Sequence, residues 1–324
     1  MKGLTDIPGL RVGHASDFEA LTGCTAVLCE RGAVAGVHVC GAATGTEELE
    51  VLSPYHVTDR IHAVVLAGGS AFGLEAASGV RRYLEQNGVG FETRAAKVPL
   101  VACAILYDLS IGKASVRPTR EMGEAAAAAA TAEAVAEGSL GAGTGATVGK
   151  LYGMSRAMKG GLGSATVALE GASAGVRVSA LVAVNAFGDV VDPAGGRIVA
   201  GARGSRKGEM ADTARQIRMG ARGGGFRKEN TTLAVVATNA RLTKAEAARL
   251  AQMASAGMAR VLSPVFTMFD GDIVFALSPG EERADLNALG VAAAEAVSQS
   301  ILRAVRSARG LGGVPGLAPE PARG

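Results

Sequence analysis

The chain has 324 residues and a mass of 32.4 kDa, which is enough to bury a substantial core as one large domain or two small ones. Hydrophobic residues make up 48% of it and charged residues only 19%, a composition that argues against disorder. The formal net charge is +3, and the basic residues are scattered apart from two groups at residues 203–207 and 222–228, so nothing demands a nucleic-acid partner.

Cysteine spacing and the N-terminal segment bear on the cellular compartment. None of the four cysteines forms a C-x-x-C pair, and their apolar neighbours predict buried, reduced thiols. The N-terminus lacks a basic segment leading into an apolar one, and no run of about eighteen apolar residues appears. We therefore expect a cytoplasmic protein with no membrane association.

Apolar runs and helical patterns are mixed along the chain. We expect strands over residues 34–39, 61–66, 98–106, 176–184, 232–238 and 273–277, and helices over residues 71–84, 120–137, 243–262 and 284–307. The third of these helices should start with a capping box formed by Thr243 and Glu246. Because strands and helices do not alternate regularly, layers of sheet and helix in an α+β fold are favoured over a doubly wound sheet.

Two further segments are expected to be irregular. The glycine-rich stretch over residues 201–225 is predicted to be a solvated loop, and a phosphate-binding patch is the less favoured alternative. The tail over residues 310–324 contains three prolines and is expected to be flexible. No internal repeat or clear linker divides the rest, so residues 1–309 are predicted to form a single domain.

Several familiar motifs are incomplete. Residues 145–150 approach a phosphate-binding loop, but Thr144 and Leu151 replace its required glycine and hydroxyl residue. The Gly-Gly-Ser sequence ending at Ser70 has the wrong spacing for a nucleophile elbow, and Ser70 is expected to begin a helix. The four histidines all lie in the first fifth of the chain without metal-ligand spacing. We therefore expect neither a metal nor an organic cofactor.

A hydrolase without a histidine base needs another proton acceptor. An α-amino group titrates near 8, so about a tenth of free amino termini are unprotonated at neutral pH. A threonine at a new N-terminus thus supplies nucleophile and base together. Asn230-Thr231-Thr232 fits, because it follows a polar glycine-rich segment and opens an apolar strand. Alternatively, Asn230 is a turn residue and the two threonines only begin the strand.

A second polar feature precedes the last predicted strand. Asp270 and Asp272 are two positions apart as the chain enters this strand, so their carboxylates should share a face and could hold an ammonium or align a hydroxyl. A turn with two solvated aspartates is the alternative. A calcium loop would need further oxygen ligands at fixed spacing, which the sequence lacks.

Taken together and in order, these features resemble one family. The chain is similar to the L-aminopeptidase/D-esterase family of self-processing N-terminal-nucleophile peptidases, and most to its branch with the nylon-oligomer endohydrolase. The Thr231 to Asp270 spacing of 270 − 231 = 39 positions fits this pattern. The matching segments extend over nearly the whole chain, at residues 66–76, 105–108, 141–150, 185–192, 230–232 and 270–272.

The resemblance implies a four-layer αββα sandwich of the N-terminal-nucleophile hydrolase type. It also implies a precursor that is cut after Asn230 into an α chain (residues 1–230) and a β chain (residues 231–324). The hydroxyl of Thr231 would attack the preceding carbonyl, and water would release the new N-terminus. The two chains would stay associated within a homotetramer.

Site roles follow from the same resemblance. Thr231 would be the nucleophile and its amine the base, with Asp270 and Asp272 orienting both groups. Asn185 would donate to the developing oxyanion, a contact whose loss typically costs about a hundredfold to a thousandfold in rate. Lys150 would lie near the nucleophile and lower the pKa of the amine.

The substrate expectation depends on a departure from many relatives. Those carry serine after a glycine, together with a Ser/Glu pair, and favour short peptides with free amino termini. The threonine and paired aspartates of this chain match the branch that hydrolyses ω-amino-acid oligomers, and Tyr107 would line the substrate pocket. We expect an amidohydrolase acting on short peptides or such oligomers, and possible ester cleavage. The alternatives are an acyltransferase of the ornithine-acetyltransferase type and a non-catalytic binding or assembly protein of the same fold.

Overall fold

The structure is a computed structural model that describes residues 1–206, 208–221 and 229–319. Its centre is a nine-stranded mixed sheet in the order β10-β11-β14-β16-β2-β4-β7-β3, with β1 paired to β2. The strands are β1 (Arg11–Asp17), β2 (Thr22–Val39), β3 (Thr46–Glu47), β4 (Arg60–Ala67), β7 (Val101–Ile105), β10 (Gly161–Ala168), β11 (Arg177–Asn185), β14 (Thr231–Thr238) and β16 (Ile273–Ser278).

The long strand β2 belongs to both halves of this sheet. Its first part, up to Leu28, pairs with β1 and β4, and its last part, Val34 to Val39, pairs with β16. The β2–β4 register shifts between Leu28 and Ala33. Such an irregularity bends a strand, so the two halves can pack face to face.

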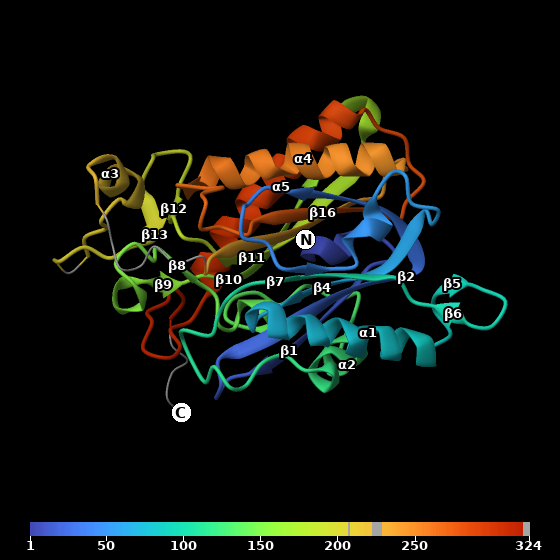
Figure 1. Cartoon of the computed structure of the whole chain (residues 1–324). Helices are drawn as coiled ribbons and strands as arrows, with labels where there is room; N and C mark the ends of the chain where they lie inside the picture. Colours follow the sequence, from blue (N-terminus) through green and yellow to red (C-terminus); the bar gives the residue numbers. More distant parts are fainter. Residues whose placement is uncertain (207, 222–228, 320–324) are drawn as a thin grey trace.

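Helices cover the two outer faces (Figure 1). On one side lie α4 (Lys244–Val261) and α5 (Leu286–Ser307), and on the other α1 (Glu75–Gln86) and α2 (Arg120–Ala128). Contacts confirm this order, because α5 packs on β10 and β11 and α4 on β2 and β16, whereas α2 packs on β1 and β2.

Three apolar cores separate the four layers. Alternate residues of β11 show the pattern: Val182 packs toward α4 and α5, whereas Leu181 packs toward the other half of the sheet. A third core lies between α1 and α2 and their half of the sheet, around Val65 and Val80. Strands buried on both faces read as continuous apolar runs, which explains the sequence pattern. The predicted αββα sandwich is confirmed.

Short elements complete the fold. They are the strands β5 (Phe91–Glu92), β6 (Lys97–Val98), β8 (Thr147–Val148), β9 (Met158–Lys159), β12 (Asp189–Val191), β13 (Ile198–Ala200) and β15 (Leu262–Ser263), and the helix α3 (Thr213–Arg218). Single 3-10 turns are η1 (Gly3–Asp6), η2 (Leu49–Leu52), η3 (Ser70–Leu74), η4 (Gly141–Gly143), η5 (Met154–Arg156) and η6 (Gly171–Ser173).

Several element boundaries differ from the prediction. The helix expected over residues 120–137 ends at Ala128, because the following residues pair with the N-terminal segment: Thr131 exchanges two main-chain hydrogen bonds with Val12. The helix expected over residues 71–84 is a 3-10 turn from Ser70 followed by α1. Strands β1 and β10 were not predicted, since their glycines and polar residues interrupt the apolar pattern.

The C-terminal tail is attached over residues 310–319, which corrects the expectation that it is flexible there. Lys159 N donates to Pro315 O at 2.8 Å, Ala318 N donates to Ala308 O at 2.9 Å, and Val314 is buried. Main-chain hydrogen bonds of this kind satisfy buried polar groups on both partners. Residues 320–324 of the expected tail lie outside the described residues.

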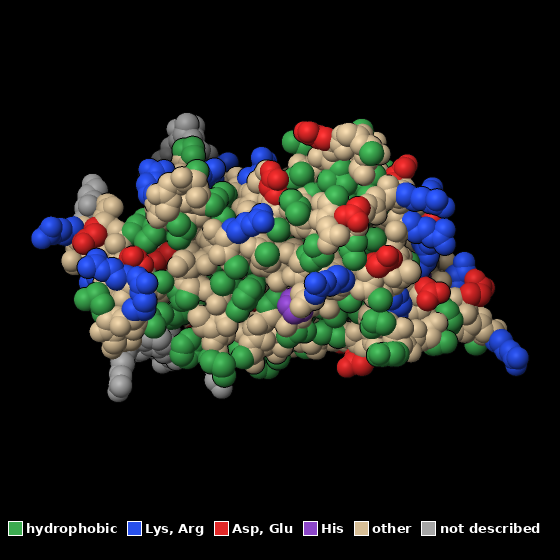
Figure 2. All heavy atoms as spheres, turned by 90° about the horizontal axis from the view of Figure 1, so that it is seen from above, with side chains coloured by type: hydrophobic (Ala, Val, Ile, Leu, Met, Phe, Trp, Pro, Cys, Tyr) green, Lys and Arg blue, Asp and Glu red, His purple; other side chains and the backbone are tan. Residues whose placement is uncertain are grey.

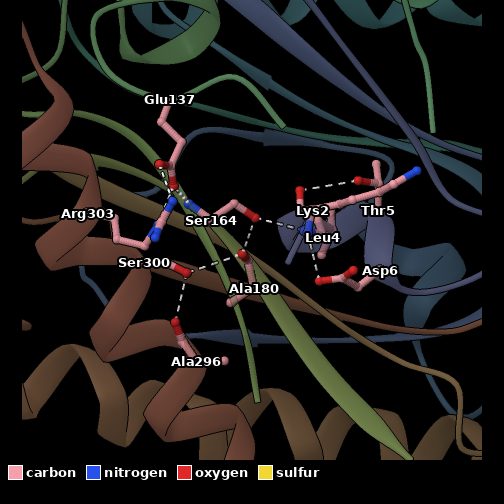
Figure 3. A network of polar contacts seen from close by, with 10 residues as sticks. All are labelled: Lys2, Leu4, Thr5, Asp6, Glu137, Ser164, Ala180, Ala296, Ser300 and Arg303. Carbon is pink, nitrogen blue, oxygen red and sulfur yellow. Dashed lines mark hydrogen bonds and ion pairs between the residues drawn. The ribbon is translucent and has the colours of Figure 1, made fainter. Parts of the chain in front are cut away.

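Local capping and polar contacts fix the outer helices. Thr243 and Glu246 form the predicted capping box at the start of α4. A buried polar network (Figure 3) ties the N-terminal segment, β10, β11 and α5 together: Ser164 Oγ accepts from Leu4 N at 2.8 Å and donates to Ala180 O, which also accepts from Ser300. Glu137 accepts from Ser164 N and from the guanidinium of Arg303.

Helix α5 is long and apolar enough to cross a membrane by length and composition, with a mean hydropathy of 1.2. However, 67% of that stretch is buried against the rest of the chain. The outer face of the α4/α5 layer, seen in Figure 2, interleaves acidic, basic and hydrophobic side chains. All four cysteines are free; three are buried as predicted, and Cys40 is half-buried.

Close backbone packing between β2 and α4 gives a stability prediction. A Cβ atom at Gly36 would lie 2.1 Å from the main-chain nitrogen of Ala248, which cannot move aside as a side-chain tip can. Gly36→Ala should therefore cost about 1–3 kcal/mol of unfolding free energy. Thermal unfolding measures this loss. The control is Gly195→Ala, where nothing lies within 4 Å of the added atom. Equal melting temperatures for the two variants would contradict the packing.

Candidate active site

Thr231 is the first residue of β14 and lies in the middle of the sheet. It pairs with Asn185, the last residue of β11, and its other neighbour is the parallel strand β16. Because β14 and β16 are parallel, their starting residues lie at the same edge, and Asn230 forms a bridge with Asp270. The sheet therefore brings together segments that are 39 positions apart, and Thr231 is only 3% exposed.

Two hydrogen-bond donors contact the carbonyl oxygen of Asn230. The hydroxyl of Thr231 donates to this oxygen at 2.6 Å, and the main-chain N–H of Gly271 donates to it at 2.7 Å. A Cβ atom at Gly271 would lie 2.4 Å from Ala43 O and 2.8 Å from Thr231 Oγ1, so glycine is needed for this approach. The arrangement places a hydroxyl beside a carbonyl whose oxygen already has a donor for developing negative charge.

Asp272 lies against the residue that follows Thr231. Its Oδ1 accepts from the main-chain N–H of Thr232 at 2.6 Å, and its own carbonyl accepts from the N–H groups of Cys40 and Gly41. Burial, followed by repulsion from Asp270, raises the pKa of Asp272 to about 8. This carboxyl group therefore titrates near neutral pH, a range in which it can exchange a proton.

Asp270 is anchored by donors from two directions. Its Oδ2 accepts from the hydroxyl of Thr267 at 2.5 Å and from the N–H of the same residue, and its Oδ1 accepts from the N–H of Phe187 at 3.2 Å. Burial raises its pKa, although these bonds and the ammonium of Lys150 oppose the shift. The two carboxylates thus lie near each other at the start of β14. Asp270 accepts from Phe187 and Thr267 and Asp272 from Thr232, whereas the Thr231 hydroxyl donates to the Asn230 carbonyl.

Asn185 holds Lys150 and Tyr107 in the same site. Lys150 Nζ donates to the side-chain oxygen of Asn185 at 2.7 Å and to its main-chain oxygen at 2.9 Å. Thr147 N also donates to the side-chain oxygen, and Asn185 Nδ2 donates to Tyr107 O at 3.0 Å. Donors on one side and an acceptor on the other fix the orientation of the amide. Asn185 therefore positions Lys150 and Tyr107. One of its two amide hydrogens is used by Tyr107 O, so the other would have to donate to the oxyanion, as the resemblance implies.

Lys150 is the cation of the site. It is 7% exposed, and desolvation lowers its pKa to about 7, although Asp270 and Glu229 favour its charged form. It lines a small pocket together with the predicted substrate-binding residue Tyr107, and with Thr147, Met154 and Glu229. The structure thus brings all the sequence-predicted site residues to one edge of the sheet.

A second buried charge pair explains motifs that the sequence left unassigned. Asp108 accepts from Thr22 Oγ1 at 2.8 Å and from Gly69 N at 2.7 Å, and a Cβ atom at Gly145 would collide with its side chain. Burial raises the pKa of Asp108, while desolvation lowers that of the nearby Lys159 to about 7. The glycine-rich segments around residues 68 and 145 therefore pack against Asp108 and support the wall of the pocket.

The segment before the candidate cleavage point is anchored more firmly than the predicted loop. Asp189 accepts from Ala202 N at 2.8 Å and from both the N–H and the hydroxyl of Thr213. Gly201 and Ala202 are buried, and α3 follows. The solvated-loop prediction is therefore wrong for this part, whereas residues 207 and 222–228, which include Arg222, lie outside the described residues.

Sequence reasoning did not assign roles to Gly271, Thr267 or Phe187. The glycine between the two aspartates was the available signal, since a residue without Cβ often marks a close main-chain approach. The main-chain N–H of Phe187 leaves no trace in side-chain chemistry. Among the described residues, no group of three or more His, Cys, Asp or Glu side chains is placed to hold a metal ion.

The sequence model of peptidase family S58 matches residues 2–318. This chain belongs to peptidase family S58. Its chemistry is accordingly the hydrolysis of peptide or amide bonds, which suits a buried hydroxyl beside a carbonyl and titratable groups.

Curated relatives agree with the family assignment. The chain is 36% identical to an uncharacterized aminopeptidase of Mycobacterium bovis, over 97% of this chain and 96% of that protein. It is 33% identical to the 6-aminohexanoate-oligomer endohydrolase of a Kocuria species, over 93% of this chain and 85% of the relative. Both alignments are nearly full length, so the similarity extends over the whole fold.

Solved structures show the same fold. The L-aminopeptidase D-Ala-esterase/amidase of Ochrobactrum anthropi, described as a variant of the Ntn hydrolase fold, superposes with a TM-score of 0.74 at 21% identity, over 95% of this chain and 86% of that one. A Burkholderia beta-aminopeptidase superposes with a TM-score of 0.70 at 24% identity, over 98% and 91% of the two chains. The S58 chain described here therefore has the Ntn hydrolase fold.

The raised pKa of Asp272 gives a test by stability. As pH rises from about 4 to about 8, Asp272 ionises in the unfolded chain but stays protonated in the folded one, so the unfolded state binds fewer protons and stability falls. Asp272→Asn removes this loss. Its unfolding free energy relative to the parent should therefore increase between pH 5 and pH 8, as measured by urea unfolding. A difference that is constant with pH would show that Asp272 is ionised in both states.

Proposed function

We propose that this S58 peptidase cuts itself between Asn230 and Thr231, and that the freed Thr231 is the nucleophile for amide hydrolysis. One observation carries the proposal: the Thr231 hydroxyl lies 2.6 Å from the oxygen of the Asn230 carbonyl, and Gly271 N–H donates to that same oxygen. A hydroxyl that begins a buried strand has little freedom to turn away.

Self-cleavage would proceed as an N-to-O acyl shift. The Thr231 oxygen forms a bond to the Asn230 carbonyl carbon, the peptide C–N bond breaks, and the hydroxyl proton passes to the departing nitrogen. Negative charge develops on the Asn230 oxygen, where the Gly271 N–H is already placed to stabilise it. Water then hydrolyses the ester and gives the Asn230 carboxylate and a free Thr231 with both amine and hydroxyl.

Turnover would reuse the same oxygen. The new α-amine accepts the hydroxyl proton and passes it to the leaving amine of the substrate. Asp272 contacts the amide of Thr232, so its carboxylate lies where it can hold the adjacent amine after cleavage. The ammonium of Lys150 disfavours a second positive charge nearby, which lowers the pKa of the amine and increases its unprotonated fraction.

Short peptides or ω-amino-acid oligomers are the proposed substrates. The relatives include proteins named aminopeptidase and 6-aminohexanoate-oligomer endohydrolase, and both names describe cleavage of a linear amide. The proposed working form is a tetramer of cleaved αβ units in the cytoplasm. The tetramer follows from the family resemblance, and the cytoplasmic location from the character of the N-terminal segment.

Replacement of Thr231 tests whether its hydroxyl is the nucleophile in self-cleavage and in turnover. Thr231→Ala should remain one 32.4 kDa chain without amidase activity, because it lacks the attacking oxygen. Thr231→Ser keeps the oxygen and should retain part of both functions. A denaturing gel, intact-mass analysis and N-terminal sequencing of the smaller fragment measure the outcome. Efficient cutting of the alanine variant would rule out Thr231.

Asp270→Asn tests the carboxylate pair. The substitution weakens the three contacts of Asp270 with Thr267 and Phe187, and should slow both self-cleavage and turnover by about tenfold to a hundredfold through misplacement of the site. The matched control is Glu170→Gln, an exposed carboxylate beyond the far end of β10. Rates that match this control would remove Asp270 from the site.

Competing acceptors distinguish hydrolysis from acyl transfer. With the cleaved enzyme and an amide substrate, most of the acyl group should appear as the free acid even when an amine such as ornithine is added. Mass spectrometry of the products measures the partition. Predominant transfer of the acyl group to the added amine would favour the acyltransferase alternative.

A further inference from the structure

The uncut chain shows how an acyl group lies in the candidate site. In the proposed self-cleavage, the Asn230 acyl carbon becomes bonded to Thr231 Oγ1, and in turnover the substrate acyl carbon becomes bonded to the same atom. Both esters would then place their carbonyl oxygen near Gly271 N–H, which donates to the Asn230 oxygen in the uncut chain. Residues on the acyl side of the scissile bond, Asn230 and Glu229, are therefore a template for the acyl half of a substrate.

The first template residue occupies an enclosed subsite. Asn230 is 2% exposed, and its side-chain amide donates to the main-chain oxygen of Phe269 at 3.2 Å. Phe269 also packs against Phe187, with ring centroids 5.5 Å apart, which fixes this wall. An acyl residue that resembles asparagine in size and polarity fits this subsite.

The second template residue faces the cation of the site. Glu229 and Lys150 line the same pocket, and the carboxylate of Glu229 acts on the ammonium as a nearby opposite charge. Lys150 is held rigidly, because its Nζ bonds both oxygens of Asn185. A fixed, poorly solvated ammonium attracts a carboxylate and repels a second cation more strongly than an exposed lysine does.

Other carboxylates in this pocket offer little to a substrate ammonium. Among the described residues that line it, Asp108 is the only carboxylate besides Glu229, and its two oxygens accept from Thr22 and Gly69. Cleavage would make Glu229 the penultimate residue of the α chain, so that a substrate acyl group that displaces it would face Lys150. A peptide with a free α-ammonium next to the scissile carbonyl would then meet a cation.

We infer that this pocket takes acyl groups with a carboxylate at the position of Glu229, opposite Lys150. The preferred substrates are then N-blocked acidic peptides, cut within the chain, rather than peptides with a free amino terminus. This inference rests on the proposed role of Thr231. In the step it describes, the Thr231 oxygen takes the acyl carbon, the amide C–N bond breaks with proton transfer to the leaving amine, and water releases the acid.

The experiment uses the self-cleaved enzyme and four fluorogenic amides of aminomethylcoumarin. Three carry blocked dipeptides, acetyl-Glu-Asn, acetyl-Gln-Asn and acetyl-Lys-Asn, and the fourth carries asparagine with a free amine. We expect kcat/KM to be about fivefold higher for the Glu compound than for the isosteric Gln compound, as one partly buried charge pair provides. The Lys and free-amine compounds should be slower still.

Variants assign this preference to Lys150. In Lys150→Met, whatever its absolute rate, the ratio of Glu to Gln hydrolysis should fall to about one. Lys97→Met, which removes an exposed lysine from the β5–β6 hairpin, should keep the parental ratio. A preference that survives in Lys150→Met would overturn the inference.

Self-cleavage of the precursor provides a readout that does not require an active Lys150 variant. Glu229→Gln should slow processing of freshly synthesised precursor, and Glu229→Lys should slow it further, by about fivefold or more. Glu170→Lys makes the same charge change beyond the far end of β10 and should have no effect. Unchanged processing in both Glu229 variants would contradict the pairing.

The outcomes distinguish failure of this inference from failure of the proposed amide hydrolysis. Coumarin release without charge preference, or fastest release from the free-amine compound, overturns only the inference. If the self-cleaved protein releases coumarin from none of the four amides, the inference is overturned, and the proposed amide hydrolysis is overturned as well if an ω-amino-acid oligomer is not cut either.

Discussion

The parallel pairing of β14 with β16 is the constraint on which the site depends. Parallel neighbours begin at the same edge, so the residues that open the two strands must meet, whatever their distance along the chain. The contact from Gly271 N to Asn230 O at 2.7 Å joins these openings. It holds the carbonyl against the Thr231 hydroxyl and leaves the flanking aspartates on either side. A shift of this pair by one residue would turn the site groups to the opposite face of the sheet.

Burial shifts the pKa values of the charged groups at that edge. The two carboxylates and the ammonium are almost completely removed from water, which raises the pKa of both Asp270 and Asp272 and lowers that of Lys150 to about 7. Each group is compensated by hydrogen bonds from main-chain or side-chain donors and acceptors, so the cluster is tolerated in the fold. Groups that titrate near neutral pH can move protons at low cost, whereas solvated aspartate and lysine would be locked in one charge state.

The four layers explain why such a cluster can exist in a chain of this size. Strands covered on both faces exclude water along their whole length, and only their ends approach the surface. Close main-chain packing, as at Gly36 against α4, replaces large side chains in a sequence with few aromatic residues. The supporting pair around Asp108 extends the same principle behind the pocket wall. The solved S58-like structures share this layered fold.

Local sequence signals determined much of the architecture. Apolar runs located six of the central strands, because a strand buried on both faces leaves a run that needs no partner to be recognised. The capping box located the start of α4 for the same reason, since its atoms lie within one turn. The Asn-Thr and Asp-Gly-Asp segments, ordered as in the resembling family, identified the residues that lie together at the start of β14.

Tertiary structure alone decided the rest. Strands β1 and β10 exist because neighbouring strands supply their hydrogen bonds, and the alanine-rich helix stops at Ala128 because Thr131 pairs with Val12 instead. The roles of Gly271 N–H and Phe187 N–H were hidden, because every residue except proline carries the same main-chain donor. Asn185 was identified by resemblance, but only the fold shows that its amide holds Lys150 and Tyr107. Such contacts join residues far apart in sequence, and no local pattern specifies which of them meet.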